Sequence, residues 1–287
     1  MDFIAPAKIN LYLKVLKKRD DGYHDIETLF ERISIFDRVS VELSSQDKTT
    51  IKCSNPGVPV GEDSLMMRAV NSFAQKKGQH LAFEIYLEKH IPIAAGLGGG
   101  SSDAAALLKG LNEITGNTLD EKTLMSIAGE LGADIPFFMK NSSFAFGTNR
   151  GDSLTEIETS LKLWHVVVAA PFELSTAEVY GELSGFGLTK HRVVDRIISD
   201  FLKKHDVSNL VNFFHNDLQI IALRKNPVLR EVIETLEKAG AGGVLLSGSG
   251  PAVFGVFRKR EVMEAANSIR RVFSCDQGWD VKVAHTY

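Results

Sequence analysis

Four glycines fall within the five positions of Gly96-Leu97-Gly98-Gly99-Gly100, and two serines follow them. Glycine loses more conformational freedom on folding than any other residue, so a clustered run indicates a backbone that must bend sharply or approach another group closely. A strand-like segment precedes the run. The segment after it has one apolar helical stripe, made of Ala104, Leu107, Leu108, Leu111 and Ile114. The run therefore predicts a strand–loop–helix unit, with the helix beginning at Ser101.

This loop has the properties of a phosphate site. Its bare backbone N–H groups, and those at the start of the following helix, favour an anion. The hydroxyls of Ser101 and Ser102 lie where they would meet a phosphate oxygen or a bound Mg²⁺. The P-loop pattern fails because no Gly-Lys-Ser/Thr follows, and the dinucleotide pattern fails because Ser101 takes the place of its third glycine. A tight turn with serine caps is the competing interpretation.

The chain as a whole reads as two α+β lobes that meet near residue 155. In the first lobe, alternation over residues 7–15 predicts a strand with one buried face; further strands are expected at 26–43, 49–53 and 81–88, and helices at 63–77 and 120–131. The second lobe reads as a split βαβ sandwich, with strands at 163–170, 244–247, 252–257 and 279–285 and helices at 192–204, 210–224, 227–239 and 260–273. Its glycine–serine turn at 247–251 is either a simple hairpin connection or a second loop facing the same ligand.

Two charged residues are candidates for chemistry. Asp134 is flanked by apolar residues, so its carboxylate should be partly desolvated and needs a partner. It fits a general base, or a group that positions Mg²⁺ and an attacking hydroxyl; alternatively it caps a short helix opening at Pro136. Lys8 lies mid-strand beside Asn10. One interpretation places Lys8 on the solvated face of an edge strand. The other gives its ammonium a function, in which it lowers the pKa of an attacking hydroxyl or pairs with Asp134.

Tyr23 and His24 follow a turn at Asp20-Asp21-Gly22. A tyrosine–histidine pair in a surface loop can serve only to pack against the rest of the protein. It can equally hold a flat heterocycle through stacking and a hydrogen bond from a ring nitrogen.

Composition excludes several classes of protein. A formal net charge of −3 over 287 residues argues against a nucleic-acid binder that relies on broad positive charge. No stretch is long and apolar enough to span a bilayer, and the N-terminus lacks the pattern of a signal peptide. The two cysteines, Cys53 and Cys275, match no metal-ligand spacing. We therefore expect a cytoplasmic protein, a monomer or weak homodimer, with neither nucleic acid nor membrane as partner.

Three segments resemble the signature motifs of the GHMP kinases, the family of galactokinase, homoserine kinase and mevalonate kinase. They are Pro6 to Leu11, Pro92 to Ala105, and Leu246 to Phe254, in the family's order. Asp21-Gly22-Tyr23-His24 and residues 131–138 resemble the members whose substrate carries a cytidine diphosphate group. The resemblance runs from about residue 4 to the last strand. It implies an α+β, two-lobed GHMP kinase fold, with an N-terminal lobe like ribosomal protein S5 domain 2 (1–155) and a ferredoxin-like C-terminal lobe (156–287).

The resemblance also implies an activity, in which ATP with Mg²⁺ phosphorylates a substrate hydroxyl in non-mevalonate isoprenoid precursor biosynthesis. Asp134 would take the hydroxyl proton and Lys8 would stabilise the charge. The substrate would contact Asn10, Tyr23, His24, Asp134, Thr176 and Tyr180, with His24 at the cytosine edge and Tyr180 as a second aromatic against the base. The implied ATP contacts are Lys89, Pro92, Ala94, Ala95, Gly96, Leu97, Gly98, Gly99, Gly100, Ser101 and Ser102; Ser102 is the candidate Mg²⁺ contact.

Three positions depart from the family pattern. Ser64 replaces a common asparagine near the expected adenine contact, Asn149 replaces a usual glycine, and Ala252 replaces a usual threonine.

Two rival functions stay open. Another GHMP kinase, acting on homoserine, mevalonate or a sugar, would have no cytosine for Tyr23-His24 to hold. A non-catalytic metabolite sensor on the same fold would not need both Lys8 and Asp134.

Overall fold

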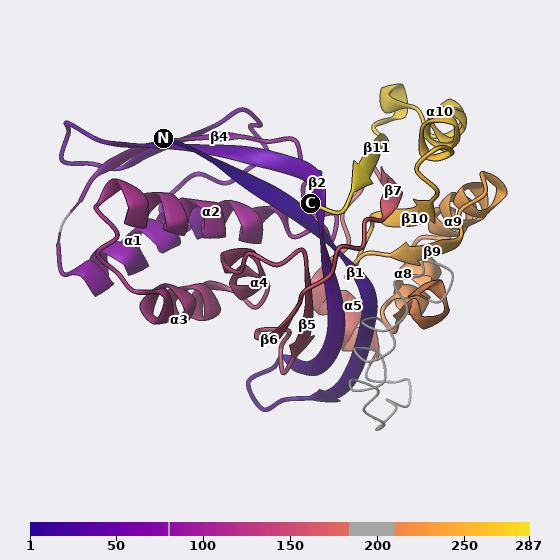
Figure 1. Ribbon diagram of the computed structural model, residues 1–287, viewed down its shortest axis with the longest axis horizontal. Coiled ribbons are helices and arrows are strands. Elements are labelled where there is room, and N and C mark those ends of the chain that lie inside the picture. The colour runs from indigo at the N-terminus through magenta and orange to yellow at the C-terminus, as the bar shows by residue number, and fades with distance from the viewer. Residues whose placement is uncertain (80, 184–209) are drawn as a thin grey trace. The chain divides into compact units, whose positions relative to one another are not determined.

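The computed structural model describes residues 1–79, 81–183 and 210–287 (Figure 1). The chain forms two compact units. Unit 1 comprises Met1–Ala7, Ile35–Ile93 and Gly98–Asn141, and unit 2 comprises Lys8–Ser34, Ala94–Leu97 and Ser142–Tyr287. Two long strands, β1 (Asp2–Lys18) and β2 (His24–Leu43), contribute residues to both units. The lobe boundary near residue 155 stays a prediction.

Unit 1 packs four helices against a small sheet. The end of β2 pairs antiparallel with β4 (Phe83–Glu88), which pairs parallel with β3 (Thr50–Cys53). The helices are α1 (Leu65–Lys77), α2 (Gly99–Ile114), α3 (Glu121–Leu131) and α4 (Ile135–Met139), and they lie on one side of β4 (Figure 1). A side chain at Gly110 of α2 would come within 2.8 Å of the Phe3 ring, so glycine is what allows α2 to lie close to β1.

Unit 2 contains two groups of strands. The beginning of β2 pairs with β5 (Phe144–Thr148), which pairs with β6 (Ser153–Ile157), while β1 pairs parallel with β8 (His215–Asn216). A separate antiparallel sheet has the order β11-β7-β10-β9, from β7 (Trp164–Ala169), β9 (Gly243–Leu246), β10 (Val253–Phe257) and β11 (Asp280–His285). Numbered within the sheet, this order is 4-1-3-2, which confirms the ferredoxin-like arrangement expected from the sequence.

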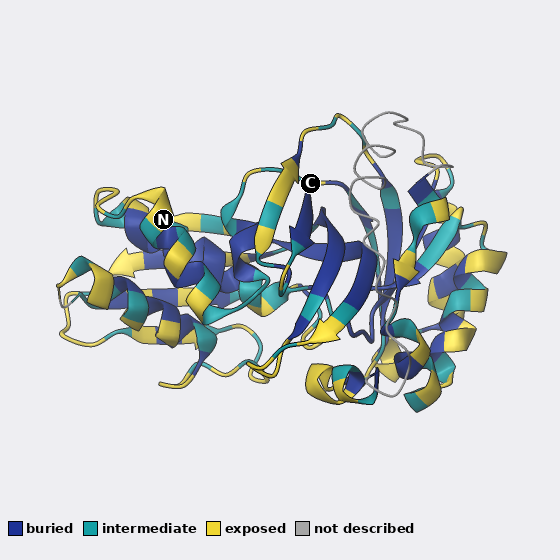
Figure 2. Cartoon of the chain, turned by 90° about the horizontal axis from the view of Figure 1, so that it is seen from below, coloured by how far each residue is buried: buried dark blue, intermediate teal, exposed yellow. Residues whose placement is uncertain are grey.

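Helices and short turns also occur in the described part of unit 2. Helices α9 (Val228–Lys238) and α10 (Val262–Val272) pack on the ferredoxin-like sheet, and their apolar residues share one buried cluster with Val166, Val168 and Val253. Helix α5 (Thr176–Leu183) and α8 (Gln219–Lys225) join the same cluster, and two 3₁₀ turns occur at Val211–Phe213 and Cys275–Gln277. Figure 2 shows the buried residues concentrated on strands and on the inner stripes of helices.

Two predictions about these elements are wrong. The strand over residues 7–15 is buried on both faces, because its polar residues Lys8, Asn10 and Lys14 are themselves buried. The helix expected at 210–224 is interrupted by β8 and begins only at Gln219. The Asn216 side chain explains the break: its Nδ2 donates to the carbonyls of Leu246 and Gly248, and its Oδ1 accepts from the amide of Leu218. The helix expected at 192–204 lies outside the described residues.

In the part of the chain that the structure describes, no helix combines the length and the apolar character needed to cross a bilayer.

Candidate active site

The glycine run turns sharply into α2. Gly96 and Gly98 adopt φ values of 80° and 69°, in the left-handed region that glycine tolerates without steric cost. Helix α2 begins at Gly99, two residues earlier than predicted, so Ser101 and Ser102 lie in its first turn. The Ser102 hydroxyl is buried and has no hydrogen-bond partner among the described residues. An unsatisfied buried hydroxyl in the first turn of a helix fits a ligand that supplies an oxygen or a cation.

The two glycine turns pack directly against each other. The amide of Ala252 donates to the Ala95 carbonyl at 3.0 Å, and the Ser247 hydroxyl donates to the Gly96 carbonyl at 3.0 Å. A Cβ at Gly96 would lie 2.2 Å from the Ser247 carbonyl oxygen. The turn at 247–251 is therefore more than a hairpin connection, because it holds the start of the glycine loop in place.

Lys8 is anchored on the same loop. Its amide donates to the Leu97 carbonyl at 2.9 Å, and its Nζ donates to the Gly96 carbonyl at 3.1 Å and to Asn10 Oδ1 at 2.7 Å. The side chain is only 4% exposed, which rules out the solvated-face interpretation. A buried ammonium with fixed acceptors is a defined point charge beside a candidate phosphate loop.

A buried threonine continues this chain of hydrogen bonds. Asn10 Nδ2 donates to Thr28 Oγ1 at 2.8 Å, and the Thr28 hydroxyl donates to the Tyr12 carbonyl at 2.8 Å. Sequence reasoning missed Thr28, because a threonine within a run of strand-forming residues carries no distinguishing signal. The structure thus makes Asn10 a partner of Lys8 as well as a candidate substrate contact.

Asp134 directly precedes α4 and is half-buried. Its side chain makes no capping hydrogen bond to that helix, so the structure does not use it as the side-chain cap considered from the sequence. Asp134 belongs to unit 1 and Lys8 to unit 2. The catalytic pairing of these two residues stays a prediction.

Two of the residues expected to bind the nucleobase, His24 and Tyr180, are in contact. The His24 and Tyr180 rings lie 5.1 Å apart between centroids, at an interplanar angle of 31°. His24 is buried, and its Nε2 has no partner among the described residues. Burial, with a smaller effect from the charge of Lys18, lowers the pKa of His24 below its usual value, so the ring is neutral at pH 7. Thr176 hydrogen-bonds to the Ser249 hydroxyl at 2.8 Å, which places it against the second glycine turn.

Lys89 lies in a buried cluster of charges that the sequence did not reveal. Its Nζ donates to Asp37 and, at 2.8 Å, to Asp103 of α2, and both carboxylates are buried. Asp37 also accepts from the amides of His90 and Ile91. Burial raises the pKa of Asp103 to about 8. The side chains of Asp37 and Asp103 together hold the ammonium, which gives Lys89 a structural role beneath the first turn of α2. Its expected contact with ATP stays a prediction.

No group of three or more His, Cys, Asp or Glu side chains within residues 1–79, 81–183 and 210–287 is arranged to hold a metal ion. A kinase that takes Mg²⁺ together with its nucleotide needs few protein ligands, because the phosphates supply several oxygens.

Comparison with known proteins identifies the family. Residues 64–142 match the GHMP kinases N terminal domain, and residues 197–275 match the GHMP kinases C terminal domain. Proteins called 4-diphosphocytidyl-2-C-methyl-D-erythritol kinase are similar along almost the whole chain. The Desulfotalea psychrophila protein is 37% identical, covering 96% of this chain and 91% of its own, and the Geobacter metallireducens protein is 40% identical, covering 92% of each.

Solved structures agree with the sequence comparisons. A crystal structure of 4-(cytidine 5'-diphospho)-2C-methyl-D-erythritol kinase matches with a TM-score of 0.81 and 31% identity, covering 99% of this chain and 98% of that one. A mevalonate kinase structure matches with a TM-score of 0.69 at 14% identity, which shows a shared fold alone. The expected two-lobed fold is confirmed, and the chain belongs to the GHMP kinase family.

Proposed function

We propose that this protein is a cytoplasmic kinase that uses ATP to phosphorylate the 2-hydroxyl of 4-diphosphocytidyl-2-C-methyl-D-erythritol, in non-mevalonate isoprenoid precursor biosynthesis. The observation that carries the choice of substrate is His24. It is a buried, neutral histidine whose Nε2 has no hydrogen-bond partner among the described residues, and its ring packs on Tyr180. A neutral imidazole can donate from one nitrogen and accept at the other, and a cytosine edge offers both an acceptor and a donor. The relatives that share most of the chain carry the same substrate in their names.

The chain's own residues supply positioning and charge for the transfer. In the proposed step, the substrate hydroxyl oxygen forms a bond to the terminal phosphorus of ATP while the bridging bond to the β-phosphate breaks, releasing ADP. Asp134 accepts the hydroxyl proton. Lys8, held by the Gly96 carbonyl and Asn10, offsets negative charge on the reacting groups. Ser102 and the first turn of α2 fit the polyphosphate, and Mg²⁺ bound with the nucleotide would neutralise phosphate charge there.

The test is ADP release by the purified protein with ATP, Mg²⁺ and 4-diphosphocytidyl-2-C-methyl-D-erythritol, in parallel with homoserine, mevalonate and galactose. We expect turnover with the cytidine compound alone. Turnover with another acceptor would reject the substrate but keep the kinase. Absence of turnover with all four, in a folded protein that still binds ATP, would favour the sensor function.

The Asp134→Ala variant tests the role of the carboxylate in the same assay. It should bind ATP normally, measured by calorimetry, and lose phosphoryl transfer by about two orders of magnitude or more. Near-normal turnover would remove Asp134 from the mechanism.

A further inference from the structure

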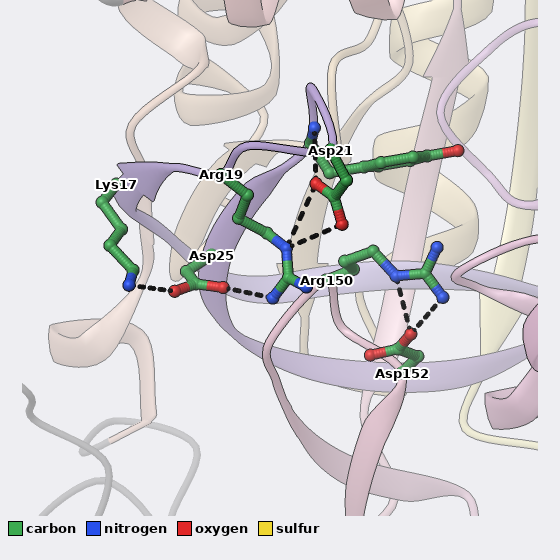
Figure 3. Close-up of polar contacts among 7 residues, drawn as sticks. Lys17, Arg19, Asp21, Asp25, Arg150 and Asp152 are labelled. Carbon is green, nitrogen blue, oxygen red and sulfur yellow. Dashed lines mark hydrogen bonds and ion pairs between the residues drawn. The ribbon is translucent and has the colours of Figure 1, made fainter.

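The backbone of Tyr23 is fixed at the turn between β1 and β2. Its carbonyl accepts from the Arg19 amide at 2.8 Å, and its own amide donates to Asp21 Oδ1 at 3.1 Å. The Arg19 guanidinium bridges the carboxylates of Asp21 and Asp25, donating at 3.0 and 2.8 Å (Figure 3). This network positions the backbone but leaves the Tyr23 side chain, which is 52% exposed, free to rotate about χ1 unless something holds the ring.

Arg150 lies against that ring. Its guanidinium carbon is 5.1 Å from the centre of the Tyr23 ring, within the range of a cation–π contact. Asp152 Oδ2 accepts from Arg150 Nε at 2.8 Å and from a terminal nitrogen at 2.5 Å, which orients the guanidinium plane (Figure 3). Both Arg150 and Asp152 are mostly shielded from solvent, with side-chain exposures of 24% and 19%.

The turn that carries Arg150 is tied to the strand that carries His24. The Ile26 amide, two residues after His24, donates to the Asn149 carbonyl at 2.6 Å. Asn149 and Gly151 adopt φ values of 59° and 95°, and Gly151 approaches Ile26 closely enough that a Cβ would lie 3.3 Å from its Cδ1. The placement of Arg150 beside Tyr23 therefore follows from backbone contacts within unit 2 as well as from the ring contact.

We infer that Arg150, oriented by Asp152, is a positioning residue for recognition of the substrate base: it supports one face of the Tyr23 ring so that the ring is presented beside His24. This inference rests on the proposed function. A direct alternative is that the Arg150 charge attracts the diphosphate of the substrate. The two explanations differ in what they require, since stacking needs the planar guanidinium held by Asp152, whereas attraction needs only a positive charge.

Two single variants separate these explanations in steady-state assays of ADP release. If Arg150 positions Tyr23, Arg150→Lys and Asp152→Asn should each raise the KM for the cytidine substrate about three- to tenfold, with kcat and the KM for ATP within about twofold of wild type. If the charge alone acts, Arg150→Lys should behave as wild type, and Asp152→Asn should lower the KM because it removes a negative charge. That pattern would overturn the inference.

A double-mutant cycle tests whether Arg150 acts through Tyr23. Tyr23→Leu should raise the same KM, and adding Arg150→Met to it should raise it no further. Additive effects would overturn the inference, because Arg150 would then act independently of the ring. Tyr23→Phe, which keeps the stacked ring, is the matched control and should retain the effect of Arg150→Met.

Binding of CDP measured by calorimetry gives a readout that does not depend on turnover. Wild type should bind CDP, and Arg150→Met should weaken it about three- to tenfold with an unchanged melting temperature. Unaltered CDP affinity in that variant would overturn the inference. Failure of the proposed function would appear separately, as a wild-type protein that binds CDP but does not phosphorylate the cytidine substrate.

Discussion

Replacing Thr28 by valine should impair the catalytic role proposed for Lys8, although Lys8 itself is unchanged. The Thr28 hydroxyl accepts from Asn10 Nδ2 and donates to the Tyr12 carbonyl, and Asn10 Oδ1 in turn accepts from Lys8 Nζ. Valine matches the shape of threonine but offers neither a donor nor an acceptor. The substitution therefore leaves a buried N–H of the Asn10 amide without its acceptor and removes one hydrogen bond to the Tyr12 carbonyl. It also removes the contact that turns the Asn10 oxygen toward Lys8.

The hydrogen bonds that are lost, together with typical hydrogen-bond energies, set the size of both effects. A buried donor left without its partner costs about 1–3 kcal/mol, and loss of the hydrogen bond to the Tyr12 carbonyl costs about 0.5–1.5 kcal/mol more, so the free energy of unfolding should fall by about 2–4 kcal/mol. A hydrogen bond to a charged group is worth about 1.5–3 kcal/mol, and losing the orientation of one such bond to Lys8 should lower kcat by about tenfold or more. The KM for ATP should change little, because the backbone anchors of the glycine loop remain.

Urea unfolding followed by circular dichroism measures the first effect, and steady-state ADP release at saturating ATP measures the second. Thr28→Ser is the matched control: it keeps the hydroxyl, loses one methyl group, and should keep kcat within about twofold. A Thr28→Val protein with normal kcat would refute the reasoning. So would equal losses of kcat in both variants, since the effect would then come from packing and not from the hydroxyl.

Three further changes have defined outcomes. Gly96→Ala places a Cβ 2.2 Å from the Ser247 carbonyl oxygen, at a residue whose φ is 80°. Both the melting temperature and the affinity for ATP, measured by calorimetry, should therefore fall. Normal values would contradict the close packing of the two turns. Asn149→Gly should raise the free energy of unfolding in urea by about 0.5 kcal/mol, because glycine adopts a φ of 59° without steric cost; a decrease would show that the Asn149 side chain has a stabilising contact. Asp103 has a folded pKa raised to about 8, so the native state binds more protons than the unfolded state and stability falls as pH rises from about 4 to 8. Asp103→Asn should flatten the melting temperature over that window, and an unchanged slope would exclude Asp103 as its source.

Local features of this fold were predictable from the sequence because they depend on neighbouring residues. The helix at residues 65–77 ends at Gly78, with φ 67°, as its sequence indicated, and the glycine run bends where its composition required. The order of strands and helices after residue 163 likewise predicted the ferredoxin-like sheet. Periodicity and turn chemistry act over a few residues, and so they can be read directly.

The features that the sequence predicted wrongly, or did not reveal, depend on contacts between residues that are distant in sequence. Alternation along β1 indicated a polar outer face, yet Lys8 and Asn10 are buried. Their hydrogen-bond acceptors lie far along the chain, 88 residues from Lys8 at Gly96 and 18 residues from Asn10 at Thr28. The buried cluster around Lys89 has the same character, since Asp37 lies 52 residues before it. Polar residues on a strand indicate solvent only when no distant partner exists, and a single sequence does not reveal that partner.

The departures from the family pattern show which property each position requires. Ser64 is the N-cap of α1, and its hydroxyl accepts from the Met67 amide as an asparagine side chain also can. Asn149 adopts the left-handed conformation, which asparagine tolerates better than other residues with a side chain. Both replacements keep a backbone function while changing the residue. Gly96 allows no such replacement, because the space for a Cβ is already filled by another backbone segment. Position 96 should therefore be restricted to glycine by packing, whereas position 149 is restricted only by its backbone conformation.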